Sequence, residues 1–236
     1  MCGRFNITSD PLTRLLMELV GLPHPGPDNH NAAPTETIGV LRISADGDPE
    51  IVPMRWWLTP SWSEGPSTRY SMFNARSETA ARSPAFRGPY RQRRCVVPVT
   101  GFYEWARQDG RRLPYYLKPH DAPGLLLAGL WDRWKHPESG EEMDSFAVLT
   151  VPAAPEMAFV HSRQPLMLSM VDARRWMDPE SRDYGEVVRS DLPGVLDAVP
   201  VSGYVNDARH KDGRCVEPVG PAVPLVPGRG LREEAL

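Results

Sequence analysis

The chain has 236 residues, a size that suits one large domain or two small ones and that can bury a core without disulfide staples. Its net charge of -3 and isoelectric point near 6.1 exclude a protein that holds long duplexes by overall charge alone, so any nucleic-acid site must be a local patch. The 26 prolines exclude a helical bundle and predict many short elements joined by turns.

The first predicted element is a helix from Asp10 to Val20. Its apolar residues recur at helical spacing, Asp10 suits the N-cap, Pro11 suits the first turn and Gly21 suits the end. The segment 22–34 is rich in Pro, Asn, His and Gly and is predicted to be a loop.

Strands and short helices are predicted along the rest of the chain. The expected strands are 37–43, 51–58, 94–99, 113–118, 125–131, 145–151 and 195–204. The expected helices are 74–82, 172–177 and 179–190, a surface excursion is expected at 61–70, and Gln108-Asp109-Gly110-Arg111 predicts a hairpin turn. No repeat or linker marks a boundary, so we expect one β-rich α+β domain over residues 1–226, with mixed, mostly antiparallel sheets and a disordered tail at 227–236.

The cysteines and the N-terminus indicate a reducing compartment. Cys2, Cys95 and Cys215 are odd in number and form no CxxC pair, which argues against a disulfide framework and a zinc ribbon. The N-terminus lacks the apolar stretch of a secretory signal, and no run approaches the ~20 apolar residues of a membrane span. We expect a cytoplasmic protein without a membrane segment, a metal or a cofactor.

Cys2 is the most informative residue. Removal of Met1, which a small second residue permits, would leave an α-amine and a thiol on one residue. The amine can attack an aldehyde to give an imine, and the thiol can close on the imine carbon to give a thiazolidine ring. An α-amine with a pKa of about 7.8 is roughly a tenth neutral at pH 7, whereas a lysine near 10.4 is only about 0.04 % neutral. The sequence therefore points to covalent capture of an aldehyde.

The residues after Cys2 support this interpretation. On Cys2 alone, a small buried residue beside the start of the chain is the simpler explanation. Gly3, however, lets the backbone bend close to other groups, Arg4 can hold a phosphate and Phe5 can anchor the segment in the core. Most termini fray, so a terminus with these residues is built to be tied down.

Two pairs of polar residues are candidates for the same site. Asn74 could orient the Cys2 amine and Arg76 could bind phosphate, although an Asn helix cap beside an exposed Arg is a serious alternative. Glu104 lies between aromatic residues and could shuttle protons if desolvated, or it could face water on an edge strand. His161 could donate a proton, although a lone His is by default a loop residue.

Aromatic and basic residues suggest a nucleic-acid groove. The candidates for base stacking are Trp56, Trp57, Trp62 and Trp105. The alternative is that most of them, including one of Trp56 and Trp57, are core residues. The basic run 87–94 is usually a solvated face, but it could track a DNA backbone.

Six short motifs follow one another along the chain. They are MCGRF at 1–5, NAAP at 31–34, PSW at 60–62, NARSE at 74–78, GFYEW at 101–105 and HSRQPL at 161–166. In sequence and order they resemble the SOS-response-associated peptidase (SRAP) family, the abasic-site-processing proteins, and the resemblance runs from residue 2 to about Pro218. Each motif alone is weak, but six in order are highly specific. Trp57 departs from the family, because many members carry Gly there.

The resemblance implies a role for each matching residue. Cys2 resembles the residue that crosslinks to the opened sugar aldehyde, and Asn74 resembles the catalytic Asn beside its amine. Glu104 and His161 resemble a pair that moves protons in ring opening and imine chemistry. The residues implied to contact DNA are Arg4 and Arg76 at phosphates and Pro34, Trp62 and Trp105 as wedge or stacking residues.

Three hypotheses follow from the sequence. In the first, a monomer binds single-stranded DNA and crosslinks Cys2 to an abasic site after removal of Met1, with weak strand cleavage as a side reaction. The second is a peptidase with Cys2 as nucleophile, which turnover of a separate peptide would favour. The third is a non-covalent single-strand-binding module, which equal affinity for intact and abasic strands would favour.

Overall fold

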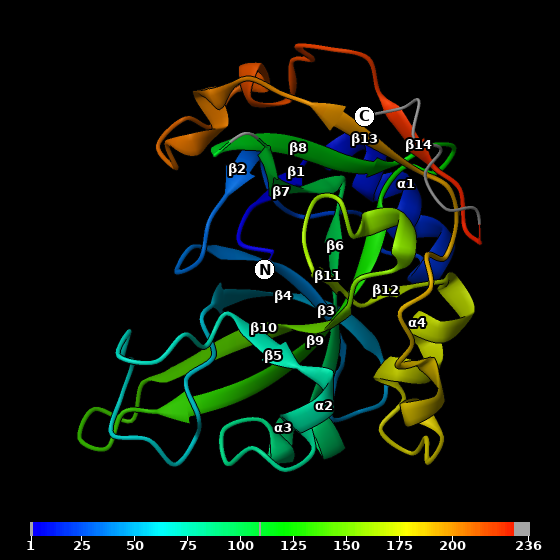
Figure 1. Ribbon diagram of the computed structural model, residues 1–236. Coiled ribbons are helices and arrows are strands. Elements are labelled where there is room, and N and C mark those ends of the chain that lie inside the picture. The colour runs from blue at the N-terminus through cyan, green and yellow to red at the C-terminus, as the bar shows by residue number, and fades with distance from the viewer. Residues whose placement is uncertain (1, 109, 229–236) are drawn as a thin grey trace.

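The computed structural model describes residues 2–108 and 110–228, which form two β-sheets with short helices at their margins (Figure 1). The first sheet is antiparallel throughout, in the order β14-β13-β8-β7-β1-β2. Its strands are β1 (Phe5–Ile7), β2 (Asn29–Ala32), β7 (Gly101–Gln108), β8 (Arg111–Pro119), β13 (Leu196–Pro200) and β14 (Val223–Leu225).

The second sheet closes into a small barrel. Strand β10 pairs with both β9 and β4, which completes a ring through β3 and β6. Short strands extend the ring: β5 and β11 pair with β10, and β12 pairs with β9. The strands are β3 (Thr37–Ile43), β4 (Pro49–Trp56), β5 (Asn74–Arg76), β6 (Arg94–Val99), β9 (Leu125–Lys135), β10 (Glu142–Pro152), β11 (Arg163–Pro165) and β12 (Met167–Leu168).

The helices are short. They are α1 (Ser9–Val20), α2 (Ser77–Ala80), α3 (Arg87–Gln92) and α4 (Met170–Met177), with 3-10 turns η1 (Pro155–Met157), η2 (Tyr184–Val187), η3 (Gly203–Asn206) and η4 (Gly213–Val216). Helix α1 buries Leu12, Leu15, Leu16 and Leu19, which share one face at this spacing. Gly21 ends α1 in the left-handed conformation, with a φ of 75°, as the sequence predicts.

A column of aromatic rings joins the N-terminal strand to the barrel. Phe5 of β1 is fully buried and stacks on Trp56 of β4 at 3.9 Å between ring centroids. The next ring, Phe146 of β10, lies 6.2 Å from Trp56 and nearly parallel to it. The chain start is therefore fixed against the core within five residues of the terminus.

The architecture confirms the predicted β-rich α+β fold with mixed sheets, but some elements differ from their prediction. The predicted loop 22–34 contains β2, and the predicted helix 74–82 begins as β5 and becomes helical only in α2. The predicted helix 179–190 is reduced to η2, and α3 forms within the basic run. The hairpin is confirmed, because Gln108 pairs with Arg111 and Gly110 has a φ of 75°.

Two predictions concern the C-terminal tail and membrane-spanning segments. Of the tail predicted to be disordered, residues 229–236 lie outside the described residues. Across 2–108 and 110–228, no helix combines the length and the apolarity that crossing a membrane requires.

Candidate active site

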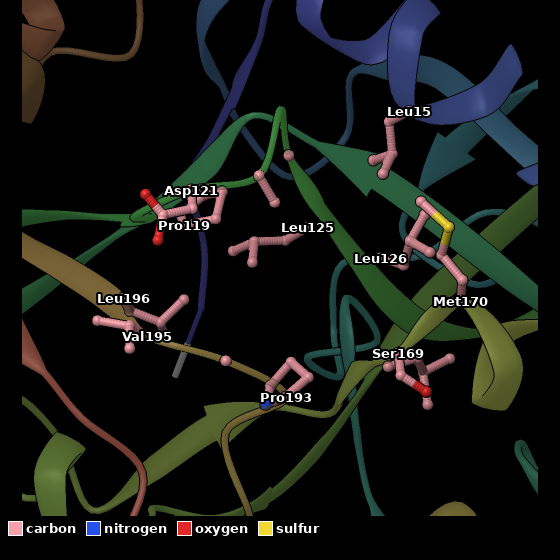
Figure 2. Close-up of a pocket in the computed structure, with 14 residues that line it drawn as sticks. Leu15, Pro119, Asp121, Leu125, Leu126, Ser169, Met170, Pro193, Val195 and Leu196 are labelled. Carbon is pink, nitrogen blue, oxygen red and sulfur yellow. The ribbon is translucent and has the colours of Figure 1, made fainter. Parts of the chain in front are cut away.

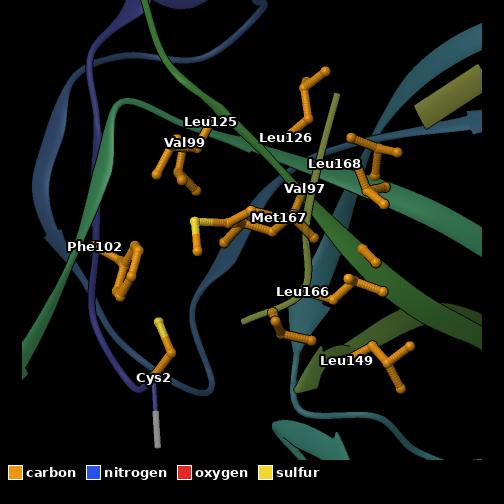
Figure 3. Close-up of a cluster of buried hydrophobic side chains, with 14 of the residues drawn as sticks. Cys2, Val97, Val99, Phe102, Leu125, Leu126, Leu149, Leu166, Met167 and Leu168 are labelled. Carbon is orange, nitrogen blue, oxygen red and sulfur yellow. The ribbon is translucent and has the colours of Figure 1, made fainter. Parts of the chain in front are cut away.

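The side chain of Cys2 is completely buried. Its thiol points into the apolar cluster that includes Phe102 and Met167 (Figure 3). Burial raises the pKa of the Cys2 thiol well above its usual range, and the nearby negative charge of Glu104 raises it further. The thiol is therefore held in its neutral form, because the anion has neither water nor sufficient positive charge to stabilise it.

Asn74 binds the backbone of Cys2 directly. Asn74 is the first residue of β5 and pairs with Val148 of β10, and the residue is only 9 % exposed. Its Nδ2 donates to the carbonyl oxygen of Cys2 at 2.8 Å, while its Oδ1 is buried and accepts no hydrogen bond from the described residues. Asn74 is not a helix cap, since Arg76 occupies the N-cap position of α2. An unused acceptor thus lies beside the main chain of Cys2.

Glu104 is a buried residue of β7, the strand that pairs with β1 at the chain start. Strand β7 carries Glu104 between β1 and β8, and the bond from the Tyr103 nitrogen to the Arg4 carbonyl extends the β1–β7 pairing toward Gly3. Glu104 as a whole residue is only 3 % exposed. A water-facing Glu on an edge strand is therefore the wrong interpretation, and the carboxyl group is buried near the Cys2 thiol, whose pKa it raises.

His161 is held on a loop before β11. His161 Nδ1 lies 3.0 Å from the backbone nitrogen of Arg163 and 3.2 Å from the Arg163 carbonyl oxygen, so the tautomer of the ring decides which of the two contacts is a hydrogen bond. The guanidinium of Arg163 binds both carboxylate oxygens of Glu78 at 2.7 and 3.0 Å, and it lowers the pKa of Glu78 to about 2. Arg163 also donates to the carbonyl of Thr150, whose hydroxyl donates to Ala75 beside Asn74. These bonds tie the His161 loop to the strand that carries Asn74.

Arg4 and Trp105 line an open cavity of about 440 Å³ next to this cluster, together with Gly3, Arg112 and Asn206. The Arg4 guanidinium donates to Asn31 Oδ1 at 2.8 Å and to the carbonyls of Val205 and Asn206 at 2.8 and 3.2 Å. Burial lowers the pKa of Arg4.

Trp105 is fixed in this cavity by the bond from its Nε1 to Asn206 Oδ1, at 2.7 Å. The Arg4 guanidinium carbon lies 6.0 Å from the centroid of the same ring. The C-terminal turn η3, which contains Asn206, thus holds both predicted residues in place.

The remaining predicted DNA contacts lie outside this cavity. Arg76, the last residue of β5 and the N-cap of α2, is exposed. Pro34 begins a turn whose next residue, Thr35, has a φ of 83°, a conformation that non-glycine residues rarely adopt. Trp62 is 67 % exposed and lines a different pocket, beside α3.

The basic run and Trp57 have structural partners. Arg93 pairs with Asp132 at 3.1 Å, and the buried Arg94 donates to the carbonyls of Trp176 and Asp178. A DNA-tracking role is therefore wrong for Arg94, whose guanidinium faces the protein interior. Trp57 donates through Nε1 to the carbonyl of Ser67 at 2.9 Å. The tryptophan side chain, which is larger than the Gly of many family members, therefore holds the surface segment 61–70.

Sequence reasoning assigned no role to three residues that build this region. They are Asn31, which binds Arg4; Arg112, which lines the cavity; and Arg163, which fixes the His161 loop. Asn31 lies within the NAAP motif and Arg163 within the HSRQPL motif, but nothing else in the sequence indicated a role for either residue. The predicted hairpin could have identified Arg112, because its register places Arg112 on the same face as Trp105.

A second cavity, of about 450 Å³, lies between α1, the β8–β9 connection and the start of α4 (Figure 2). Its lining is mostly apolar, with residues such as Leu15, Leu125 and Leu196, and among the described residues it includes Asp121 but no basic residue. This chemistry does not suit an anionic strand.

Comparison with known proteins identifies the family of the chain. A model of the family described as SOS response associated peptidase (SRAP) matches residues 1–208, and the chain belongs to this family. It is 30 % identical over 231 residues to the abasic site processing protein YoqW of Bacillus subtilis (strain 168), covering 92 % of this chain and 99 % of that one. It is also 30 % identical over 227 residues to the abasic site processing protein HMCES of Gallus gallus, covering 83 % and 68 % of the two chains.

Solved structures share the fold. A protein of Bordetella bronchiseptica superposes with a TM-score of 0.74 at 23 % identity, covering 85 % of this chain and all of that one. A phage-related protein of the same organism gives a TM-score of 0.67 at 28 % identity, covering 85 % and 94 %.

Proposed function

We propose that this protein crosslinks itself to abasic sites in single-stranded DNA through the α-amine and thiol of Cys2, once Met1 is removed. The observation that carries the proposal is the buried hydrogen bond from Asn74 to the Cys2 carbonyl, beside the buried carboxyl group of Glu104. It fixes the residue that would become the terminus, whereas an ordinary terminus is mobile. The relatives named abasic site processing proteins support the choice of aldehyde.

The reaction has two bond-forming steps. The neutral amine of Cys2 adds to the aldehyde carbon of the ring-opened sugar, and loss of one water gives an imine. The thiol then adds across the C=N bond: sulphur bonds to carbon and the thiol proton is transferred to nitrogen, which closes a thiazolidine. Glu104 and His161 are assigned the proton transfers of sugar opening and water loss.

The environment of Cys2 favours the amine as the first nucleophile. A thiolate is the reactive form of cysteine, and burial raises the pKa of this thiol well above its usual range. An α-amine, with an ordinary pKa of about 7.8, keeps a neutral fraction near pH 7. We assign Asn74 Oδ1 as the hydrogen-bond acceptor of this amine. The Asn74 side chain already donates to the Cys2 carbonyl, and it can accept from the Cys2 nitrogen in the same way that paired residues of an antiparallel sheet exchange two hydrogen bonds. The raised pKa of the Cys2 thiol also disfavours a thiolate peptidase.

The DNA strand is assigned to the surface around the chain start. Arg4 and Arg76 would contact phosphates, Trp105 would stack on a base, and Pro34 and Trp62 would wedge the strand beside the lesion. A missing base leaves room for Cys2 to reach the sugar, so the lesion itself provides selectivity. We assign the activity to a monomer in the cytoplasm, with removal of Met1 as a preceding step and β-elimination from the imine as a weak side reaction.

The test is incubation of the protein with a single-stranded abasic oligonucleotide, followed by denaturing electrophoresis. The wild-type protein is expected to give a stable adduct, and Cys2→Ala is expected to give one only when borohydride reduces the imine. Cys215→Ala, which removes another buried thiol, serves as the matched control and is expected to crosslink normally. Intact-protein mass measurement of the same sample reports whether Met1 is absent.

Three outcomes would contradict the proposal. A stable adduct of Cys2→Ala without reduction would eliminate ring closure. Adduct formation by protein that retains Met1 would eliminate the free amine. Equal affinity for intact and abasic strands with no adduct would leave a non-covalent binding module.

A further inference from the structure

Two arginines face each other on the β7–β8 hairpin. The register pairs Arg107 of β7 directly with Arg112 of β8, so both side chains leave the same face of the sheet. Like charges directly opposite each other destabilise a strand pair. In the described residues, neither guanidinium forms an ion pair that would offset the repulsion, and both side chains are exposed. The hairpin thus concentrates positive charge where the fold itself does not require it.

The same face of the hairpin borders the cavity next to Cys2. Trp105 precedes Arg107 by two positions and therefore shares its face. Arg112, Arg4 and Trp105 all line the cavity, which reaches Gly3, the residue after Cys2. Arg4 supplies a fixed charge there, because its guanidinium is already held by Asn31 and the η3 turn. The arginines of the hairpin supply additional charge at the rim.

We propose that Arg112, assisted by Arg107, binds a backbone phosphate of the single strand that flanks the lesion, so that the strand leaves the site across the β7–β8 hairpin. Guanidinium groups bind phosphate oxygens in pairs, and an anion between two facing arginines would relieve their repulsion. Trp105, immobilised by Asn206, provides a flat surface for the adjacent base. The identity of the ligand rests on the proposed function, whereas the positive charge of the hairpin does not.

Binding of an unmodified oligonucleotide tests the hairpin without any chemistry. The variants are Arg112→Gln and Arg107→Gln, and the matched control is Arg111→Gln, which removes the same charge from the same turn but on the opposite face. Affinity for a single strand without a lesion is measured from about 50 to 200 mM salt. Loss of one phosphate contact is expected to reduce the slope of log K against log salt by about 0.7 to 1 for Arg112→Gln, and not for Arg111→Gln.

A second measurement locates the phosphate. Single linkages on either side of an abasic site are replaced in turn by neutral methylphosphonate. The wild-type protein is expected to bind less tightly when one particular linkage is neutral, and Arg112→Gln is expected to be insensitive at that linkage. Equal slopes for Arg112→Gln and Arg111→Gln, or no binding of the unmodified strand by the wild type, would overturn the inference. Binding with the expected slopes but no adduct would instead overturn the crosslinking function and leave the phosphate site standing.

Discussion

Replacement of Asn74 by alanine removes the donor that holds the Cys2 carbonyl at 2.8 Å. The residue is nine-tenths buried, so water replaces the lost bond poorly. A buried carbonyl left without its donor costs about 1–3 kcal/mol. If the mutation destabilises the position of Cys2 in which its amine reacts by this energy, the rate of adduct formation falls about 5- to 150-fold, because each 1.36 kcal/mol corresponds to a factor of ten. The same energy lowers the melting temperature by about 2–12 °C.

The assay measures the rate of crosslinking under single-turnover conditions, at a temperature well below unfolding of the variant. Ser145→Ala is the matched control, because Ser145 is fully buried in the barrel and its Oγ accepts from the Thr59 nitrogen at 2.8 Å. It is expected to lose similar stability and to crosslink at the wild-type rate. A wild-type rate for Asn74→Ala, or equal slowing by Ser145→Ala, would refute the reasoning that Asn74 positions Cys2.

Three further predictions concern stability. Phe5→Ala removes a fully buried ring stacked on Trp56 and is expected to cost about 3–5 kcal/mol in chemical denaturation; a loss below about 1 kcal/mol would contradict its anchoring role. Burial lowers the pKa of His24 below its usual 6.5, so the unfolded chain binds a proton at this residue more readily than the folded chain does. Stability is therefore expected to fall as the pH drops through 6.5. In thermal melts from about pH 7 to 5, His24→Gln should weaken this dependence. Arg163 lowers the pKa of Glu78 from 4.5 to about 2, so the pair stabilises the fold above pH 4.5 and this stabilisation is lost as the pH falls toward 2. Glu78→Gln is expected to cost under about 1 kcal/mol at neutral pH, because the carboxylate is half exposed. If the variant and the wild type gave identical acid-unfolding curves, the pair would contribute nothing to stability.

The predictable parts of the fold were those whose signal is local. Leucines at helical spacing and a terminal glycine predict helix α1, and an Asp-Gly turn predicts the β7–β8 hairpin. Strand β2 carries no such signal, because its polar residues are satisfied by partners distant in the sequence, as when Asn31 binds Arg4 and the carbonyl of Asp207. Asn74 was assigned to a helix because the helical residues of α2 follow it directly, whereas its pairing with β10 depends on residues more than seventy positions away.

The site divides in the same way. The residue types at the chain start, above all Cys2 followed by Gly3, Arg4 and Phe5, determined the chemistry that the sequence could suggest, because an amine and a thiol on one residue need no tertiary contact to be recognised. Only the folded chain decided that Glu104 is buried and not water-facing, and that Arg94 faces the interior and not a strand of DNA. Burial and partnership depend on what packs over a residue, and the strands that cover these two come from parts of the chain that no local pattern connects.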